Sequence, residues 1–173
     1  VIPPALDPEA AFVSDQAGED IREAIRVEGL HKSYGDWPVL WDLNFSVGWG
    51  EFVVLFGANG TGKTTLLRVL STQARAESGT VKVAGYDCLR QAESVRRIVG
   101  VVGHSGLLYE GLTCRENLMF YGQPFRVEPI RRRVEDVLSR VGLTRRADHR
   151  VKTLSHGMQK RVAIARAILH QPQ

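Results

Sequence analysis

The order of apolar and polar residues differs between the two halves of the chain. In the first half, short apolar segments are separated by turn residues. The segments expected to form strands are 25–30, 43–47, 52–56, 81–84 and 98–102. The runs at 52–56 and 98–102 are continuously apolar, which is typical of central parallel strands covered on both faces. A helix is expected at 63–72, so the alternation predicts βαβ units with a parallel sheet.

In the second half the apolar spacing becomes helical. Thr113 and Glu116 have the spacing of a capping box, which predicts a helix that starts there and closes near Gly122. A further amphipathic helix should follow and stop at Gly142. We therefore expect an all-helical lobe over residues 107–160.

Length and composition narrow the class of protein. A chain of 173 residues with 43% hydrophobic and 24% charged residues resembles an ordinary globular protein. Its 2 cysteines stand apart, which excludes a disulfide-rich secreted scaffold and favours a reducing compartment. The apolar runs are far shorter than the ~20 residues of a membrane-spanning helix.

Charge is distributed unevenly along the chain. Residues 1–26 hold six acidic and two basic side chains, so the net charge of +4 becomes +8 over the remainder. With its prolines, the segment 1–24 is expected to be a flexible acidic extension. The basic clusters 131–133 and 145–146 lack interleaved aromatic residues, so we expect them on solvated faces and expect no nucleic-acid partner.

One motif with direct chemical meaning runs from Gly57 to Thr64. It fits G-x-x-x-x-G-K-[ST] and lies between the apolar strand expected at 52–56 and a helix, which indicates a phosphate-binding P-loop. Its glycines let backbone N–H groups and a helix N-terminus face phosphate oxygens. Lys63 is the candidate catalytic cation for the β- and γ-phosphates, and the Thr64 hydroxyl is a candidate Mg²⁺ ligand. The expected nucleotide-binding residues of the loop are Gly57, Ala58, Asn59, Gly60, Thr61, Gly62, Lys63, Thr64 and Thr65.

A second motif, Leu154-Ser-His-Gly-Met-Gln-Lys-Arg161, lies ninety residues downstream and opens an amphipathic run with Ser155 as N-cap. Together with the P-loop it resembles the LSGGQ signature of the ATP-binding-cassette (ABC) family, and the resemblance covers the chain from about residue 25 onward. Two signature positions differ, because His and Met replace the usual Gly and Gln. The resemblance implies that the signature acts in trans on the γ-phosphate held by a second subunit, through Ser155, His156, Gly157 and Gln159.

The same resemblance assigns further contacts with ATP and Mg²⁺. Tyr34 matches the aromatic residue that stacks on adenine, and Val39 lies beside the ribose. His104 stands where ABC proteins usually carry a glutamine that contacts Mg²⁺ and the attacking water. A neutral imidazole can accept a hydrogen bond or bind a metal, so His104 is a catalytic and metal-binding candidate. The alternative is that His104 is a polar loop residue whose metal contact is lost.

The resemblance implies an α/β P-loop NTPase fold, with a RecA-like mixed sheet that includes antiparallel N-terminal strands and an inserted α-helical subdomain. The ATP-binding core would occupy 25–106, and the helical subdomain 107–160 would end in the signature. Residues 161–173 would complete the signature helix and begin the return to the core. In this family an apolar strand ending in Asp-Glu follows, so these residues alone should form an incomplete sheet and hydrolyse ATP negligibly.

The implied function is that of an ATP-binding ABC transporter subunit, peripheral on the cytoplasmic face of the inner membrane. Its partners would be a transmembrane permease and a second ATP-binding subunit arranged head to tail. The permease should dock near Leu107, Leu108 and Tyr109. His104 and the ENL-x-FY run at 116–121 are most similar to haem-exporter ATPases of cytochrome c biogenesis.

Other functions remain open from the sequence. Multidrug and ABC-2-type exporter ATPases share the ENL-x-FY run, although they usually keep the glutamine. A soluble ABC protein of DNA repair or translation usually has long insertions between P-loop and signature, and here that interval is short. A small-molecule P-loop kinase has no use for the LSHGMQ segment.

Overall fold

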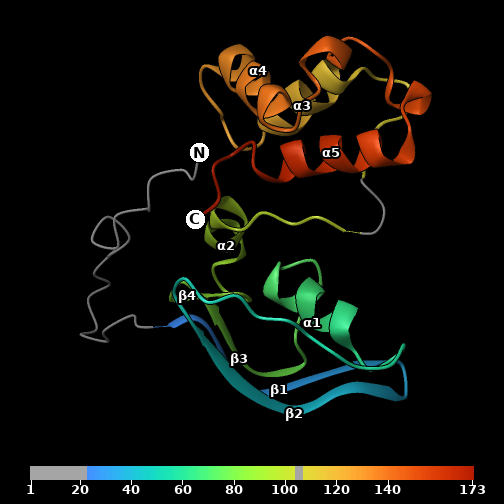
Figure 1. Cartoon of the computed structure of the whole chain (residues 1–173). Helices are drawn as coiled ribbons and strands as arrows, with labels where there is room; N and C mark the ends of the chain where they lie inside the picture. Colours follow the sequence, from blue (N-terminus) through green and yellow to red (C-terminus); the bar gives the residue numbers. More distant parts are fainter. Residues whose placement is uncertain (1–22, 104–106) are drawn as a thin grey trace. The chain divides into compact units, whose positions relative to one another are not determined.

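The structure is a computed structural model that describes residues 23–103 and 107–173. The chain divides into two compact units, one ending at Ala92 and the other running from Glu93 to Gln173 (Figure 1). The expected acidic extension, 1–24, lies outside the described residues except for its last two positions. His104 also lies outside them.

The first unit is built on an antiparallel sheet with the strand order β2-β1-β3-β4. Its strands are β1 (Glu23–Tyr34), β2 (Trp37–Gly48), β3 (Ser78–Val83) and β4 (Tyr86–Asp87). Strands β1 and β2 form a hairpin whose last pair is Tyr34 with Trp37. Gly35 takes a φ of 58° in the intervening turn, which glycine adopts without steric cost. The expected strands at 25–30, 43–47 and 81–84 are confirmed within this sheet.

Helix α1 (Lys63–Leu70) packs against the sheet through its apolar side. Leu66 and Val69 are buried, and α1 contacts strands β2 and β3. Burial of such side chains typically contributes about 1.5–3 kcal/mol each. This packing fixes the N-terminus of α1, and therefore the end of the P-loop, relative to β2.

The two segments expected to be central parallel strands are not strands. Residues 51–58 are irregular, and Phe52 and Phe56 are 92% and 90% exposed. Helix α2 (Ala92–Ile98) ends where the second strand was expected to begin, and 99–103 are irregular. A parallel strand needs neighbours for its hydrogen bonds, and no other described segment pairs as a strand with either run. The prediction of a parallel βαβ sheet is therefore wrong for the described residues.

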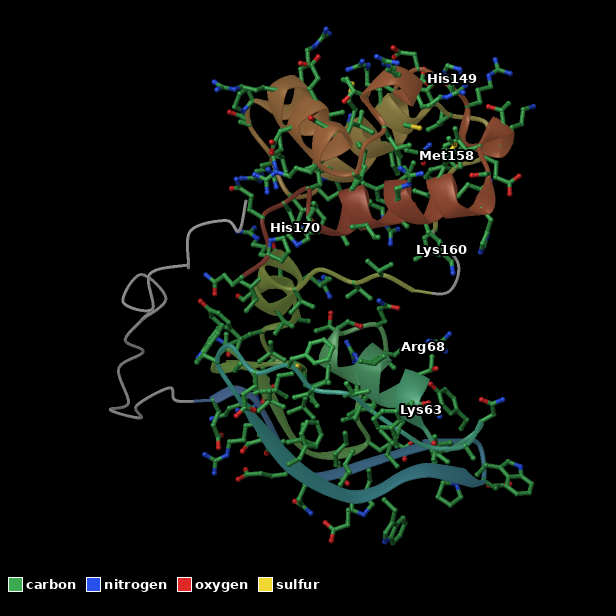
Figure 2. All side chains as sticks on the ribbon, in the orientation of Figure 1. Lys63, Arg68, His149, Met158, Lys160 and His170 are labelled. Carbon is green, nitrogen blue, oxygen red and sulfur yellow. The ribbon has the colours of Figure 1, made fainter. Side chains whose placement is uncertain are left out.

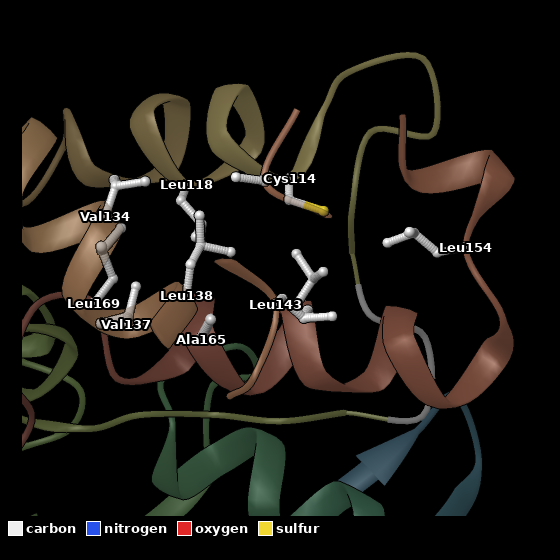
Figure 3. Packing of buried hydrophobic residues seen from close by; sticks show 11 residues of the cluster. Cys114, Leu118, Val134, Val137, Leu138, Leu143, Leu154, Ala165 and Leu169 are labelled. Atoms are coloured by element: carbon white, nitrogen blue, oxygen red, sulfur yellow. The ribbon is translucent and has the colours of Figure 1, made fainter. Parts of the chain in front are cut away.

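The second unit is helical. It contains most of α2 together with α3 (Cys114–Gly122), α4 (Ile130–Arg140) and α5 (His156–Ala167), and short 3₁₀ turns at Thr144–Arg146 and Val151–Thr153. Helices α3, α4 and α5 enclose one apolar core (Figure 3). Its buried residues are Cys114, Leu118, Val134, Val137, Leu138, Leu143, Ala147, Leu154, Val162, Ala165 and Leu169. None of the helices among the described residues is long and apolar enough to cross a bilayer.

The helix boundaries follow local signals in the sequence. At the start of α3 the Thr113 hydroxyl accepts from the Glu116 N–H at 3.1 Å, and the Glu116 carboxylate accepts from the Thr113 N–H at 2.8 Å. This reciprocal pair confirms the capping box, and α3 ends at Gly122 as expected. Helix α4 ends just before Gly142, whose φ is 68°. The expected stop at this glycine is confirmed.

One arginine of the basic cluster 131–133 does not lie on a solvated face. The side chain of Arg133 is 12% exposed and donates to the carbonyl oxygens of Leu169 at 2.9 Å and Ile168 at 2.6 Å. The last carbonyls of a helix have no partner within it, and this guanidinium supplies one beyond the end of α5. The expectation of a solvated cluster holds for Arg131 and Arg132, which are exposed, and is wrong for Arg133.

Candidate nucleotide-binding site

The P-loop leads directly into α1. Gly60 and Gly62 have φ values of 87° and 86°, a backbone conformation that side chains other than glycine rarely adopt. Gly62 is the N-cap of α1, and a Cβ placed on it would lie 2.9 Å from the Val39 carbonyl oxygen and 2.7 Å from Leu40 Cδ2. The loop therefore closes tightly against β2, with no space for a side chain at Gly62.

Lys63, the first residue of α1, reaches back into this loop; Figure 2 labels its side chain. Its Nζ donates to the carbonyl oxygens of Gly57 at 2.7 Å and Ala58 at 2.6 Å, and lies 3.3 Å from Thr61 Oγ1. The donor is charged but these acceptors are neutral, whereas a phosphate oxygen would add the attraction of an opposite charge. The ammonium group therefore lies within the loop, bonded to its backbone carbonyls.

The two threonines after Lys63 have different surroundings. Thr64 is exposed in the first turn of α1, so its hydroxyl is accessible to a cation or a phosphate. Thr65 is buried, at 9% exposure. The first N–H groups of a helix have no carbonyl partner within it, so this end of α1 also offers donors to an anion.

The expected nucleobase contacts lie on the β1–β2 hairpin. Tyr34 ends β1 with an exposed ring, and the Lys32 ammonium lies 5.2 Å from the ring centroid. Val39 is half-buried and lies against Gly62, so the structure brings it together with the P-loop. Tyr34 lies at the end of β1 and Val39 near the start of β2, so both belong to the same hairpin.

The signature residues begin α5 in the second unit. The Ser155 hydroxyl accepts from the Met158 N–H at 3.3 Å, which confirms the predicted N-cap. His156 and Gly157 are exposed, and apart from its chain neighbours and the backbone of its own helix no described atom lies within 4 Å of the Cβ position of Gly157. The first turn of α5 therefore presents a hydroxyl, open backbone and a helix N-terminus.

Gln159 has a local role that the sequence did not indicate. Its Nε2 donates to the carbonyl oxygens of Val151 at 3.1 Å and Leu154 at 3.3 Å. These bonds hold the segment that precedes Ser155. Gln159 supports the shape of the signature from inside its own chain, in addition to the role in trans that the family resemblance implies.

Sequence reasoning also missed Asn117, which is fully buried in α3. Its Oδ1 accepts from the Tyr109 N–H at 2.8 Å, and its Nδ2 donates to the carbonyl oxygens of Tyr109 at 3.0 Å and Thr113 at 2.9 Å. The available signal was an amide at a position of α3 that faces the apolar core, because a buried amide needs partners. Asn117 fixes the loop that precedes α3.

The comparison with protein families covers both motifs. A family described as "ABC transporter" matches residues 40–173, which include the P-loop and the signature. The chain belongs to the ABC transporter family.

Several characterised ABC proteins are similar to this chain. The linearmycin resistance ATP-binding protein LnrL of Bacillus subtilis is 34% identical over 86% of this chain and 49% of its own length. The spermidine/putrescine import ATP-binding protein PotA of Legionella pneumophila is 40% identical over 86% of this chain and 41% of its length. The daunorubicin resistance ATP-binding protein DrrA3 of Streptomyces coeruleorubidus is 36% identical over 87% and 48%. The chain thus spans about half the length of these relatives.

Solved structures agree on the fold. A structure described as the ATP-binding subunit of an ABC transporter has a TM-score of 0.76 and 30% identity, and covers 86% of this chain and 63% of that one. CbiO1 from Clostridium perfringens, part of the transporter complex cbiONQ, has a TM-score of 0.74 and 26% identity over 87% and 63%. The P-loop NTPase fold class predicted from the sequence is confirmed.

Proposed function

We propose that this ABC chain is the ATP-binding part of a transporter subunit, which in the whole protein hydrolyses ATP to drive transport through a membrane permease. The observation that carries the proposal is the position of Lys63 Nζ inside the loop of Gly57 to Gly62. Backbone donors, a helix N-terminus and an ammonium group together suit a nucleoside triphosphate. Family membership favours ATP among such ligands.

Each residue of the loop has a distinct part in this proposal. Lys63 exchanges its carbonyl acceptors for β- and γ-phosphate oxygens, and the backbone N–H groups around Gly60 and Gly62 donate to the same phosphates. The Thr64 hydroxyl is exposed and would hold Mg²⁺, which when bound would neutralise phosphate charge. Tyr34 would stack on adenine, with Val39 beside the ribose. The proposed second Mg²⁺ contact, His104, lies outside the described residues.

The signature would act on a second copy. Ser155 and Gly157 are exposed at the start of α5, where the positive end of the helix dipole favours an anion. In a head-to-tail dimer this end would contact the γ-phosphate bound by the partner's P-loop. ATP binding would then hold two subunits together, and hydrolysis would release them.

A membrane permease is the second proposed partner. Leu107, Tyr109 and Phe120 present exposed apolar groups in the second unit, and the half-buried ring of Tyr121 stacks on Tyr109; these four residues are hereafter the aromatic surface. A short amphipathic helix of the permease would bury them, and the subunit would lie at the cytoplasmic face of the membrane. Exposed aromatic groups that cluster in this way are typical of interaction sites.

Two classes of transported substrate are candidates for the whole protein. The ENL-x-FY run and His104 support haem export for cytochrome c biogenesis. The similarity to the resistance proteins LnrL and DrrA3 supports a multidrug-type exporter as the alternative. Substrate contacts would lie in the permease, so uptake assays with the permease would separate these two candidates.

Titration calorimetry of the full-length protein with ATP and Mg²⁺ tests the proposed nucleotide site. Replacing Lys63 with alanine should raise the dissociation constant of ATP by roughly 10- to 100-fold, because hydrogen bonds to charged groups contribute about 1.5–3 kcal/mol. The control is Lys152→Ala, which removes an exposed lysine of the second unit and should leave binding unchanged. Equal ATP affinity in wild type and Lys63→Ala would contradict the proposal.

A further inference from the structure

One backbone carbonyl of the second unit accepts two side-chain donors from different helices. The Tyr121 hydroxyl of α3 donates to the Leu107 carbonyl oxygen, and Arg166 Nη1 of α5 donates to the same oxygen at 3.2 Å. The guanidinium carbon of Arg166 also lies 4.9 Å from the centroid of the Tyr121 ring. Arg166 therefore joins the signature helix to a loop and to an aromatic ring.

The loop at Leu107 is both exposed and strained. Leu107 is 59% exposed, and its φ of 47° places a residue other than glycine in the left-handed region. Such conformations cost of the order of 1–3 kcal/mol and persist where surrounding contacts enforce them. Two of the contacts made by this residue are the hydrogen bonds that its carbonyl oxygen accepts from Tyr121 and Arg166.

The other residues of the aromatic surface have more packing and hydrogen-bond contacts than Leu107 does. The rings of Tyr109 and Phe120 meet edge to face at 5.0 Å between centroids, and those of Tyr109 and Tyr121 stack at 6.0 Å. Asn117 pairs with both backbone groups of Tyr109 from the core. A partner helix that binds to this surface would therefore displace Leu107 more readily than Tyr109.

Arg166 also lies on the helix that carries the signature. Helix α5 runs from His156 to Ala167, about 18 Å at 1.5 Å per residue. Val162 and Ala165 are completely buried in the core, and close packing of this kind transmits strain along the helix. A shift of the Arg166 end changes the position of Ser155 and Gly157 at the other end.

We propose that Arg166 is a positioning residue that couples occupancy of the aromatic surface to the signature helix. This inference rests on the proposed docking of a permease helix on that surface. A helix packed on Leu107 displaces its carbonyl oxygen, and the guanidinium of Arg166 follows because it is hydrogen-bonded to that oxygen. Tyr121 is the second member of the same junction, so the two side chains act together.

The test uses the complex of the full-length subunit with its own membrane subunit, isolated through an affinity tag and reconstituted in liposomes. ATP turnover is measured for the complex and for the free full-length subunit. Arg166→Gln removes the charge and shortens the side chain that reaches Leu107, and Tyr121→Phe removes the hydroxyl donor. The double variant combines both changes, and Arg166→Lys keeps a charged donor. The matched control is Arg161→Gln, an exposed arginine of α5 that donates to the Val141 carbonyl oxygen at 3.4 Å.

We expect the free subunit of every variant to keep the wild-type turnover and Michaelis constant for ATP. In the complex, Arg166→Gln should lose stimulation by the permease by roughly fivefold or more, the size of an ordinary allosteric coupling. Arg166→Lys should restore part of this stimulation, and Arg161→Gln should retain all of it. The double variant should be stimulated as much as Arg166→Gln alone.

Wild-type stimulation in Arg166→Gln would overturn this inference while leaving the proposed nucleotide site intact, because the free subunit reports on that site. An equal loss of turnover in the free subunit would also overturn it, since Arg166 would then serve folding or hydrolysis directly. A wild-type complex without any stimulation would overturn it together with the proposed permease docking.

Discussion

At the scale of single residues, the second unit depends on one buried amide. Asn117 satisfies both backbone groups of Tyr109, and no water can replace these bonds without entering the core. Replacing Asn117 with leucine should lower the free energy of unfolding by about 2–4 kcal/mol, because buried polar groups are left without partners. Urea denaturation of the full-length protein measures this change.

The control for that variant is Gln123→Leu, an exposed amide just after α3, which should change stability by no more than about 0.5 kcal/mol. If both substitutions had equal small effects, Asn117 would not hold the loop before α3 as described.

A second residue-scale prediction concerns pH. His170 stacks on Phe125 at 4.3 Å between centroids, and its Nε2 lies 3.2 Å from the Val99 carbonyl oxygen. Burial lowers the pKa of His170 below its ordinary value of 6.5, and the charge of Arg133 adds to the shift. The unfolded chain therefore takes up a proton at a higher pH than the folded chain does.

It follows that stability is greatest above pH 6.5 and declines as the pH falls through the lowered pKa of His170. His170→Gln keeps an N–H donor for Val99 but does not titrate, so it should show a smaller decline in urea midpoints between pH 7 and 5. His149→Gln changes an exposed histidine and should follow wild type. Identical pH profiles for wild type and His170→Gln would contradict this account.

At the scale of elements, Ser155 has two separable roles, as the N-cap of α5 and as the proposed phosphate contact. Alanine removes both and should cost about 1 kcal/mol of stability, whereas aspartate is also a good N-cap and should cost little. Both variants should lose ATP turnover, because aspartate places a negative charge opposite the γ-phosphate. Thermal unfolding and turnover of the full-length variants measure the two effects, and an active Ser155→Asp would show that Ser155 is only a cap.

The elements that the sequence predicted well are those set by neighbouring residues. Thr113 with Glu116, Ser155, and Gly142 mark helix ends through contacts within a few positions, and the structure contains all of them. The run 52–56 failed as a prediction because a parallel strand depends on hydrogen bonds from distant segments. Arg133 likewise could not be placed, since its acceptors at Ile168 and Leu169 are 35 and 36 positions away.

In the candidate site, too, the features set by neighbouring residues were predictable and those set by distant residues were not. The P-loop was predictable because its glycines and Lys63 act within eight consecutive residues. The contact of Gly62 with Val39, the loop bonds of Gln159 and the role of Asn117 each join positions that only folding brings together. A sequence pattern therefore predicts local geometry directly. It predicts tertiary contacts only where it resembles a family whose fold is known.

At the scale of the whole molecule, the two halves of the proposed catalytic site lie in different units of the chain. Lys63 belongs to the first unit and Ser155 to the second. The account holds that Lys63 of one copy and Ser155 of another form each site, so two copies should make two sites. A P-loop kinase, in contrast, would complete its site within one copy.

Mixing two inactive variants of the full-length protein tests this claim most directly. Lys63→Ala and Ser155→Ala should each lose ATP turnover alone. Half of the dimers in an equal mixture contain one copy of each, and each of these has one intact site, so about a quarter of wild-type turnover should return. A mixture that stays inactive, or a Ser155→Ala protein that is fully active alone, would contradict the account.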